Sequence, residues 1–158
     1  MYYEGFIKPF EPHFIDLLVD DMCQVDIDEV YAAHGVNPRD AVRSSVMSSD
    51  RLVCYFDDDI LLGIGGVGTT INGEGIPWLL STNYLQTWKR KNLRSFLKST
   101  RSWIEHMNEI YPYMHNYVDS RNKESIVWLE HLGFNLTETI QNYGHSKIPF
   151  IKFIKYSD

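Results

Sequence analysis

The sequence predicts a single α/β domain over residues 1–158, and three observations lead to this. A chain of 158 residues fits one domain and is long enough to bury one hydrophobic core. Apolar runs of strand length alternate along it with segments of helical periodicity. No internal repeat, low-complexity tract or proline-rich linker divides it. We therefore expect all elements to share one core.

The first half predicts a strand, three helices and then a group of strands. Asn37 and Pro38 fit the N-cap and first position of the third helix. Three aspartates separate two strands of a hairpin, and the run at 76–81 is apolar throughout, as in a strand buried on both faces. The expected elements are a strand at 2–9, helices at 11–22, 26–34 and 39–47, and strands at 51–56, 60–67 and 76–81.

The second half opens on the clearest helical pattern of the chain. Apolar residues recur at spacings of three and four over 85–111, which predicts one long amphipathic helix ended by Pro112. Asn122 should cap a later helix, and Gly133 should close that helix in a left-handed turn. The remaining expected elements are a strand at 113–118, a helix at 122–131, and strands at 134–141 and 148–156.

A run of glycines falls within the predicted strand at 60–67 and just beyond it. Its members are Gly63, Gly65, Gly66 and Gly68. Inside a strand, glycine marks close backbone packing or a bulge, and we favour this interpretation over a phosphate-binding loop.

Charge is distributed unevenly along the chain. The formal net charge is −6, but residues 1–60 carry −9 while residues 61–104 carry +5. A compact basic island in an acidic protein suggests a local anionic ligand such as a phosphorylated cofactor, or alternatively a solvated helix face. Duplex DNA binders spread positive charge over a whole face, so the overall acidity argues against nucleic acid as a partner.

The sequence has no feature of export, membrane insertion or disulfide stabilisation. No apolar run approaches the roughly 18 residues of a membrane span, and the first ten residues lack the order of a signal peptide. Cys23 and Cys54 lie far apart without the spacing of metal ligands. We expect reduced thiols, no metal, no membrane partner and a cytoplasmic location.

One local motif brings a family into view. The segment 122–134, NKESIVWLEHLGF, resembles the N-x-x-S/A-I-x-L-Y-E-K-L-G-F signature of the GNAT superfamily of acyl-CoA-dependent N-acetyltransferases. The order of elements is also similar to that fold. The resemblance implies a mixed α/β sheet with flanking helices, whose fourth and fifth strands splay apart to admit the pantetheine arm of acyl-CoA.

A narrower resemblance covers most of the chain. The stretches VNPRDA at 36–41, GIPWLL at 75–80 and NYVDSRN at 116–122 look like a family of acetyltransferase-like proteins of short-tailed bacteriophages. Some members are described as internal virion or assembly proteins. This implies a phage protein that acts in the host cytoplasm or in association with the virion, with a phage or host protein as partner.

The GNAT resemblance implies acetyl-CoA as cofactor and places its contacts. The strand at 76–81 would pair with the pantetheine, and the start of the signature helix would lie beside the cofactor. Where family members carry a glycine-rich pyrophosphate loop, this chain has Tyr84 to Asn92 without any glycine, so side-chain cations would have to replace backbone N–H groups. The expected cofactor-binding residues are Trp78, Leu79, Leu80, Ser81, Lys89, Arg90, Lys91, Asn92, Asn122 and Ser125.

The chemistry of amine acetylation needs a base, and an acid for the departing thiolate. The signature tyrosine that serves as the acid in many GNAT enzymes is Leu129 here, so another group must donate the proton. We take Tyr117, Asn116 and Glu74 as the catalytic candidates, with Tyr143 as a further phenol. Each has a structural alternative as a core aromatic, an amide that binds the pantetheine, or a solvated turn residue.

Two functions follow from the sequence. The first is a phage-encoded N-acetyltransferase that moves an acetyl group from acetyl-CoA to an amine of a protein or small molecule. The alternative is a catalytically degenerate GNAT-fold protein of virion assembly or host interaction, suggested by the missing glycines and by Leu129.

Overall fold

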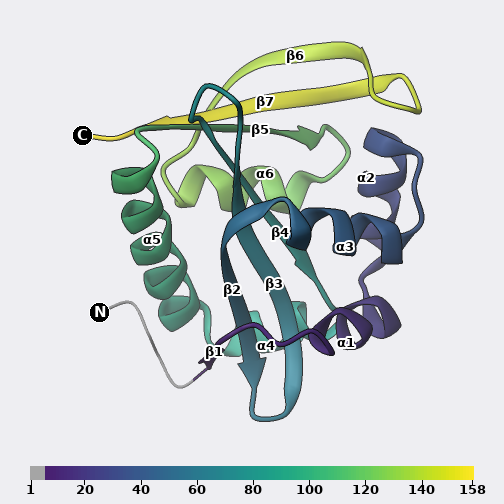
Figure 1. The fold of residues 1–158 in the computed structure, drawn as a ribbon, viewed down its shortest axis with the longest axis vertical. Helices are drawn as coiled ribbons and strands as arrows, with labels where there is room; N and C mark the ends of the chain where they lie inside the picture. Colours follow the sequence, from purple (N-terminus) through teal and green to yellow (C-terminus); the bar gives the residue numbers. More distant parts are fainter. Residues whose placement is uncertain (1–5) are drawn as a thin grey trace.

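A computed structural model describes residues 6–158, and within them the chain forms a seven-stranded sheet with helices on both faces (Figure 1). The strand order is β1-β2-β3-β4-β5-β7-β6, and every neighbouring pair is antiparallel except β4 and β5. The strands are β1 (Ile7–Lys8), β2 (Ser49–Asp57), β3 (Ile60–Thr69), β4 (Gly75–Ser81), β5 (Tyr113–Asp119), β6 (Asn135–Tyr143) and β7 (Ile148–Tyr156). The helices are α1 (Phe14–Asp21), α2 (Gln24–His34), α3 (Pro38–Met47), α4 (Tyr84–Lys91), α5 (Leu93–Ile110) and α6 (Lys123–His131).

Two hydrophobic clusters cover the two faces of the sheet. Val53 and Tyr55 of β2 belong to the cluster that packs against α5, whereas Cys54 and Phe56 pack with Leu18 of α1. This alternation follows from the two-residue period of a strand. In Figure 1, α1, α2 and α3 gather on one side of the molecule and α5 lies on the other.

The predicted helix caps are confirmed. The Asn37 side chain accepts a hydrogen bond from the Asp40 N–H at 2.9 Å, with Pro38 at the first helical position of α3. Asn122 caps α6 in the same way, and Gly133 takes the left-handed φ of 94° after it. These local signals were strong because each satisfies backbone groups that a helix end leaves open.

The glycine run of β3 serves close packing, as expected. A Cβ atom on Gly66 would lie 2.7 Å from the Arg51 carbonyl oxygen and 3.0 Å from the Trp78 ring. Since the first contact is with backbone, no rotamer change could relieve it. The run therefore brings β2, β3 and β4 together and forms no phosphate loop.

The prediction of one helix over 85–111 was wrong. The chain breaks at Asn92, with φ −125° and ψ 26°, into α4 and α5. The Asn92 side chain donates to the Trp88 carbonyl at 2.9 Å and so closes α4. The apolar spacing of three and four runs through this break, because a short amide can compete with helical hydrogen bonds without disturbing the pattern.

The N-terminal elements are shorter than expected. Of the strand predicted at 2–9, only Ile7–Lys8 is a strand among the described residues, and positions 2–5 lie outside them. The first helix begins at Phe14 instead of residue 11. Within the described part of the chain, no helix has the length and apolarity that a bilayer crossing requires.

Candidate active site

Strands β4 and β5 touch at one end and then separate. Their only pairing among the described residues is Gly75 with Met114. A Cβ atom on Gly75 would lie 2.9 Å from Tyr111 Cβ and 3.0 Å from Met114 Cγ, so glycine is what allows the strands to close at this point. Beyond it the two strands diverge, which opens a gap in the middle of the sheet.

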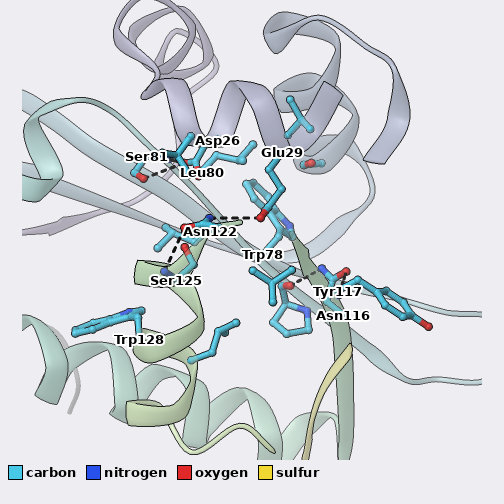
Figure 2. A pocket seen from close by; sticks show the side chains of 18 of the residues that line it. Asp26, Glu29, Trp78, Leu80, Ser81, Asn116, Tyr117, Asn122, Ser125 and Trp128 are labelled. Carbon is cyan, nitrogen blue, oxygen red and sulfur yellow. Dashed lines mark hydrogen bonds between the residues drawn. The ribbon is translucent and has the colours of Figure 1, made fainter. Parts of the chain in front are cut away.

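The side chain of Asn116 occupies the narrow end of this gap. Its amide donates to the Pro77 carbonyl of β4 at 2.8 Å, and its oxygen accepts from the Tyr117 N–H at 2.8 Å (Figure 2). One amide thus satisfies a backbone group on each strand where the ladder has stopped. Asn116, a predicted catalytic residue, is a bridge across the splay.

Two carboxylates from α2 accept hydrogen bonds from backbone N–H groups at the wide end of the gap, where β4 and β5 are farthest apart. Asp26 accepts hydrogen bonds from the Ser81 N–H at 2.8 Å and the Ser81 hydroxyl at 2.9 Å. Glu29 accepts from the Asp119 N–H at 3.0 Å. Backbone groups of Pro77, Ser81 and Asp119 on the opened edges therefore keep hydrogen-bond partners, which lowers the free-energy cost of separating the strands.

Leu79 lies between Pro77 and Ser81, the two β4 residues whose backbone groups are hydrogen-bonded to Asn116 and Asp26. Peptide groups of alternate residues in a strand point to the same edge, and those of Pro77 and Ser81 point towards β5. The N–H and C=O of Leu79 therefore face the gap. They are the strand groups to which an extended ligand can pair.

A cavity of about 950 Å³ passes through this gap and reaches both faces of the sheet. Its lining includes the predicted strand residues Trp78, Leu79, Leu80 and Ser81. On one side it is bounded by residues of α2 and α3, and on the other by residues of α4, α5 and α6. The slot between the strands is thus open, and the cavity has two chemically different ends.

Lys89 lies at the end bounded by α4, α5 and α6. Its Nζ atom is 3.3 Å from Glu124 of α6 and 4.7 Å from the centre of the Trp128 ring, and its side chain is only 12% exposed. Trp128 stacks on Phe96 at 5.4 Å. Lys89, Glu124 and Trp128, here called the clasp, join α4 to α6 across this mouth of the cavity.

The indole N–H of Trp128 is a buried donor without an acceptor among residues 6–158. A buried donor without an acceptor costs free energy, because it has lost its hydrogen bond to water. A ligand that supplies an acceptor atom would remove this cost. Trp128 lines the cavity, so an oxygen atom of a bound molecule could satisfy it.

The other predicted cofactor residues divide into two groups. Ser125 lines the cavity beside Asn122, whose side chain accepts from the Ser125 N–H at 3.2 Å. Arg90 and Lys91 are exposed at the end of α4 and, with Asn92, lie outside the cavity lining. Lys89 is therefore the one cation of the predicted basic stretch that the structure brings to the cavity.

Glu29 is the acid whose surroundings change it most clearly. Burial, which removes the carboxylate from water, raises its pKa from an ordinary 4.5 to about 7, and the neighbouring Asp26 adds to the rise. Burial also raises the pKa of Asp26. A carboxylate with a pKa near neutrality in a cavity can accept a proton from a substrate at working pH.

Asp26 and Glu29 have no predicted role beyond a place in an acidic helix. The available signal was their spacing of three within the segment 26–34, which puts two acids on one helix face. This face points towards the gap because α2 packs against β5, and that packing is not a local property of the sequence.

The predicted catalytic residues lie apart. Tyr117 lines the cavity with its ring 4.9 Å from that of Tyr143. Glu74 lies outside the lining, at the start of β4, where its carboxylate is 3.3 Å from His115 Nε2. The lining of one cavity therefore contains Tyr117, Asn116 and Glu29, whereas Glu74 lies outside it.

A family profile decides the relationship of this chain. The family described as "Bacteriophage T7, probable scaffold protein Gp13" matches residues 54–143, more than half of the sequence. The chain belongs to this family. No curated protein sequence matches it.

The fold of this Gp13-family chain is that of the GNAT acetyltransferases. Ard1 from Thermoplasma volcanium superimposes with a TM-score of 0.73 at 15% identity, covering 96% of this chain and 97% of that one. A GNAT-family acetyltransferase from Streptococcus pneumoniae gives 0.63 at 14% identity, covering 96% and 98%. An acetyltransferase from Bacillus subtilis, solved in complex with CoA, gives 0.66 at 10% identity, covering 96% and 97%.

The raised pKa of Glu29 predicts a pH-dependent stability for the Gp13-family chain. The folded chain holds the Glu29 proton up to about pH 7, whereas the unfolded chain releases it near pH 4.5. The stability that this proton contributes to the folded state is therefore fully present below pH 4.5 and is lost as pH rises through 7. Glu29→Gln should therefore gain up to about 3 kcal/mol of stability over wild type at pH 8 and little at pH 4.5. Urea unfolding at both pH values measures this. The exposed Glu130→Gln should show no such difference, and an equal gain by both variants would contradict the prediction.

Proposed function

We propose that this protein is an acyl-CoA-dependent N-acetyltransferase that acts in an infected bacterium. The observation that carries the proposal is the open passage between β4 and β5, with Lys89 at one end and Glu29 at the other. An anionic thioester carrier suits the first end, and an amine that must lose a proton suits the second. No group of three His, Cys, Asp or Glu side chains within residues 6–158 is arranged for a metal ion.

The residues of the cavity divide the reaction between them. The Leu79 peptide groups and Ser125 line the path of the pantetheine, with Lys89 and the Trp128 N–H available to its phosphate or carbonyl oxygens. Glu29 removes a proton from the acceptor ammonium. The amine nitrogen then attacks the thioester carbonyl, the C–N bond forms and the C–S bond breaks.

The leaving thiolate needs a proton, and Leu129 cannot supply one. Tyr117 and Tyr143 are the phenols of the cavity lining. Burial raises the pKa of Tyr143, which keeps its hydroxyl protonated. We assign proton donation to this pair of phenols, and the resulting phenolate takes the second proton that the attacking nitrogen loses as it becomes an amide.

The clasp gives the first test of cofactor binding. Binding of acetyl-CoA should move Lys89 from Glu124 to a cofactor phosphate, because a phosphate carries more charge and more acceptor oxygens. Lys89→Met should weaken acetyl-CoA binding by about tenfold, as expected for one charge-assisted contact. Glu124→Gln should strengthen it by a few-fold, since Lys89 is then released.

Isothermal titration of the full chain with acetyl-CoA measures both effects. Lys98→Met is the control, because Lys98 is an exposed cation of α5 outside the cavity lining. Absence of binding by wild type at millimolar acetyl-CoA would reject the proposed function. Equal affinities of Lys89→Met and Lys98→Met would reject the role of Lys89 alone.

A degenerate scaffold is the second candidate, and the description of the Gp13 family favours it. The absence of glycine from 84–92 and the leucine at 129 are consistent with lost catalysis. This candidate predicts a stable complex with a phage or host protein that forms without cofactor. Affinity capture from infected cells, combined with the Glu29→Gln variant, separates the two candidates. If Glu29→Gln impairs infection while the complex still forms, infection requires the enzyme. If the variant infects as wild type does, the scaffold is favoured.

A further inference from the structure

The turn between β6 and β7 is attached to the C-terminal end of α2. The N–H groups of His145 and Ser146 donate to the carbonyls of Ala33 at 3.2 Å and Ala32 at 3.0 Å. A Cβ atom on Gly144, which has a φ of 67°, would lie 2.7 Å from the Ala33 oxygen. The contact is therefore between backbones, and Ala33 also lines the cavity.

This attachment limits what can enter the acidic end of the cavity. A polypeptide lying across the site between α2 and the β6–β7 turn would have to break both hydrogen bonds. It would also break the ring contact of Tyr31 with His145, whose centroids are 5.1 Å apart. A compact molecule avoids these costs.

The acids that line the α2 and α3 end of the cavity form no ion pair within residues 6–158. Asp26, Glu29 and Asp40 line it from α2 and α3. Arg121 also lines it, but this guanidinium is bound to Asp119, with its Nη2 atom 2.7 Å from a carboxylate oxygen. The remaining acids therefore have no cationic side chain paired with them among residues 6–158, apart from any charge on His34 of the lining.

Glu29 also has a free oxygen. Its hydrogen bonds to the Asp119 N–H and the Asn122 side chain both use Oε1, and no hydrogen bond within residues 6–158 uses Oε2. A carboxylate that is mostly buried, lines a cavity and keeps one oxygen unpaired is suited to an ammonium group of a ligand.

We propose that the acceptor is a small polyamine, a compact molecule with at least two ammonium groups, and not an amine of a polypeptide. The inference rests on the proposed acetyltransferase function. One ammonium group binds at Asp26 and stays charged, while the second gives its proton to Glu29 and becomes the nucleophile. The nitrogen forms the new amide bond as the carbon–sulfur bond of acetyl-CoA breaks. The thiolate takes a proton from the phenol pair, and the phenolate takes the second proton that the nitrogen loses.

Thiol release from acetyl-CoA by the full chain tests this with four acceptors. Spermidine and putrescine are the polyamines, butylamine is the monoamine of matched length, and a lysine-containing peptide represents proteins. We expect kcat/KM for spermidine to exceed that for butylamine at least tenfold and the peptide to remain unmodified. If the protein binds acetyl-CoA but acetylates no polyamine, or prefers the peptide, the inference fails while cofactor binding stands. If acetyl-CoA does not bind at all, the proposed function fails first.

Asp26→Asn supplies a readout that does not depend on turnover. The asparagine oxygen can still accept from Ser81, but it no longer attracts the ammonium group that stays charged. The variant should lower the ratio of kcat/KM for spermidine to kcat/KM for butylamine about tenfold, because its effect on Glu29 is common to both acceptors. Spermidine should raise the melting temperature of wild type and of Asp28→Asn, an exposed acid of the same helix outside the cavity lining, but not of Asp26→Asn. Equal responses of Asp26→Asn and Asp28→Asn would overturn the proposal.

Discussion

Replacing Glu29 with glutamine is expected to lower kcat for acetyl transfer by about 10²- to 10⁴-fold at neutral pH, the usual range for loss of a general base. Glutamine keeps the oxygen that accepts from the Asp119 N–H, so the splay of β4 and β5 should survive. It cannot take a proton from an ammonium group. Steady-state kinetics with saturating acetyl-CoA measure the loss.

The pH dependence of kcat for wild type provides a second test of Glu29 as the base. Since the pKa of Glu29 is raised to about 7, kcat should rise through neutral pH as the carboxyl group ionises and then level off. Asp28→Asn on the same helix is the control and should keep the wild-type profile. An active Glu29→Gln with an unchanged profile would show that the base lies elsewhere, and Glu74 would return as a candidate.

Ser125→Trp should abolish acetyl-CoA binding, with an increase in Kd of at least about 100-fold, or 2.7 kcal/mol. Ser125 lines the cavity from the first turn of α6, where an indole would fill the passage that the pantetheine needs. The residue is only half-buried, so the helix should tolerate the change better than a core position would.

Val127→Trp provides a matched control for this blockade. It adds the same side chain to the same helix at a position that is 53% exposed and outside the cavity lining. Titration calorimetry should give a wild-type Kd for Val127→Trp. Circular dichroism of both variants checks that α6 is intact. Undiminished binding by Ser125→Trp would mean that acetyl-CoA does not pass beside α6.

Much of the fold was predictable because its signals are local. The caps at Asn37 and Asn122, the left-handed turn at Gly133 and the packing of the β3 glycines each depend on neighbours in sequence or on an adjacent strand. The break at Asn92 was missed because the hydrophobic spacing continues through it. A single hydrogen bond to Trp88, invisible to periodicity, ends α4 there.

The site was predictable only where strands alone define it. The run at 76–81 and the position of Tyr117 follow from the order of strands, and both line the cavity. Asp26 and Glu29 reach it because α2 packs across the open edges of β4 and β5, and a charged helix face does not reveal which surface it covers. The same holds for Lys89, whose basic neighbours Arg90 and Lys91 are exposed.

The Leu79 amide reports most directly on whether a thioester carrier threads the gap between β4 and β5. In an amide-resolved NMR titration with acetyl-CoA, its resonance should shift and its hydrogen exchange should slow, because its N–H would gain a partner from the pantetheine. A Leu79 amide that neither shifts nor gains protection at millimolar acetyl-CoA would contradict the central claim, whatever else the protein binds.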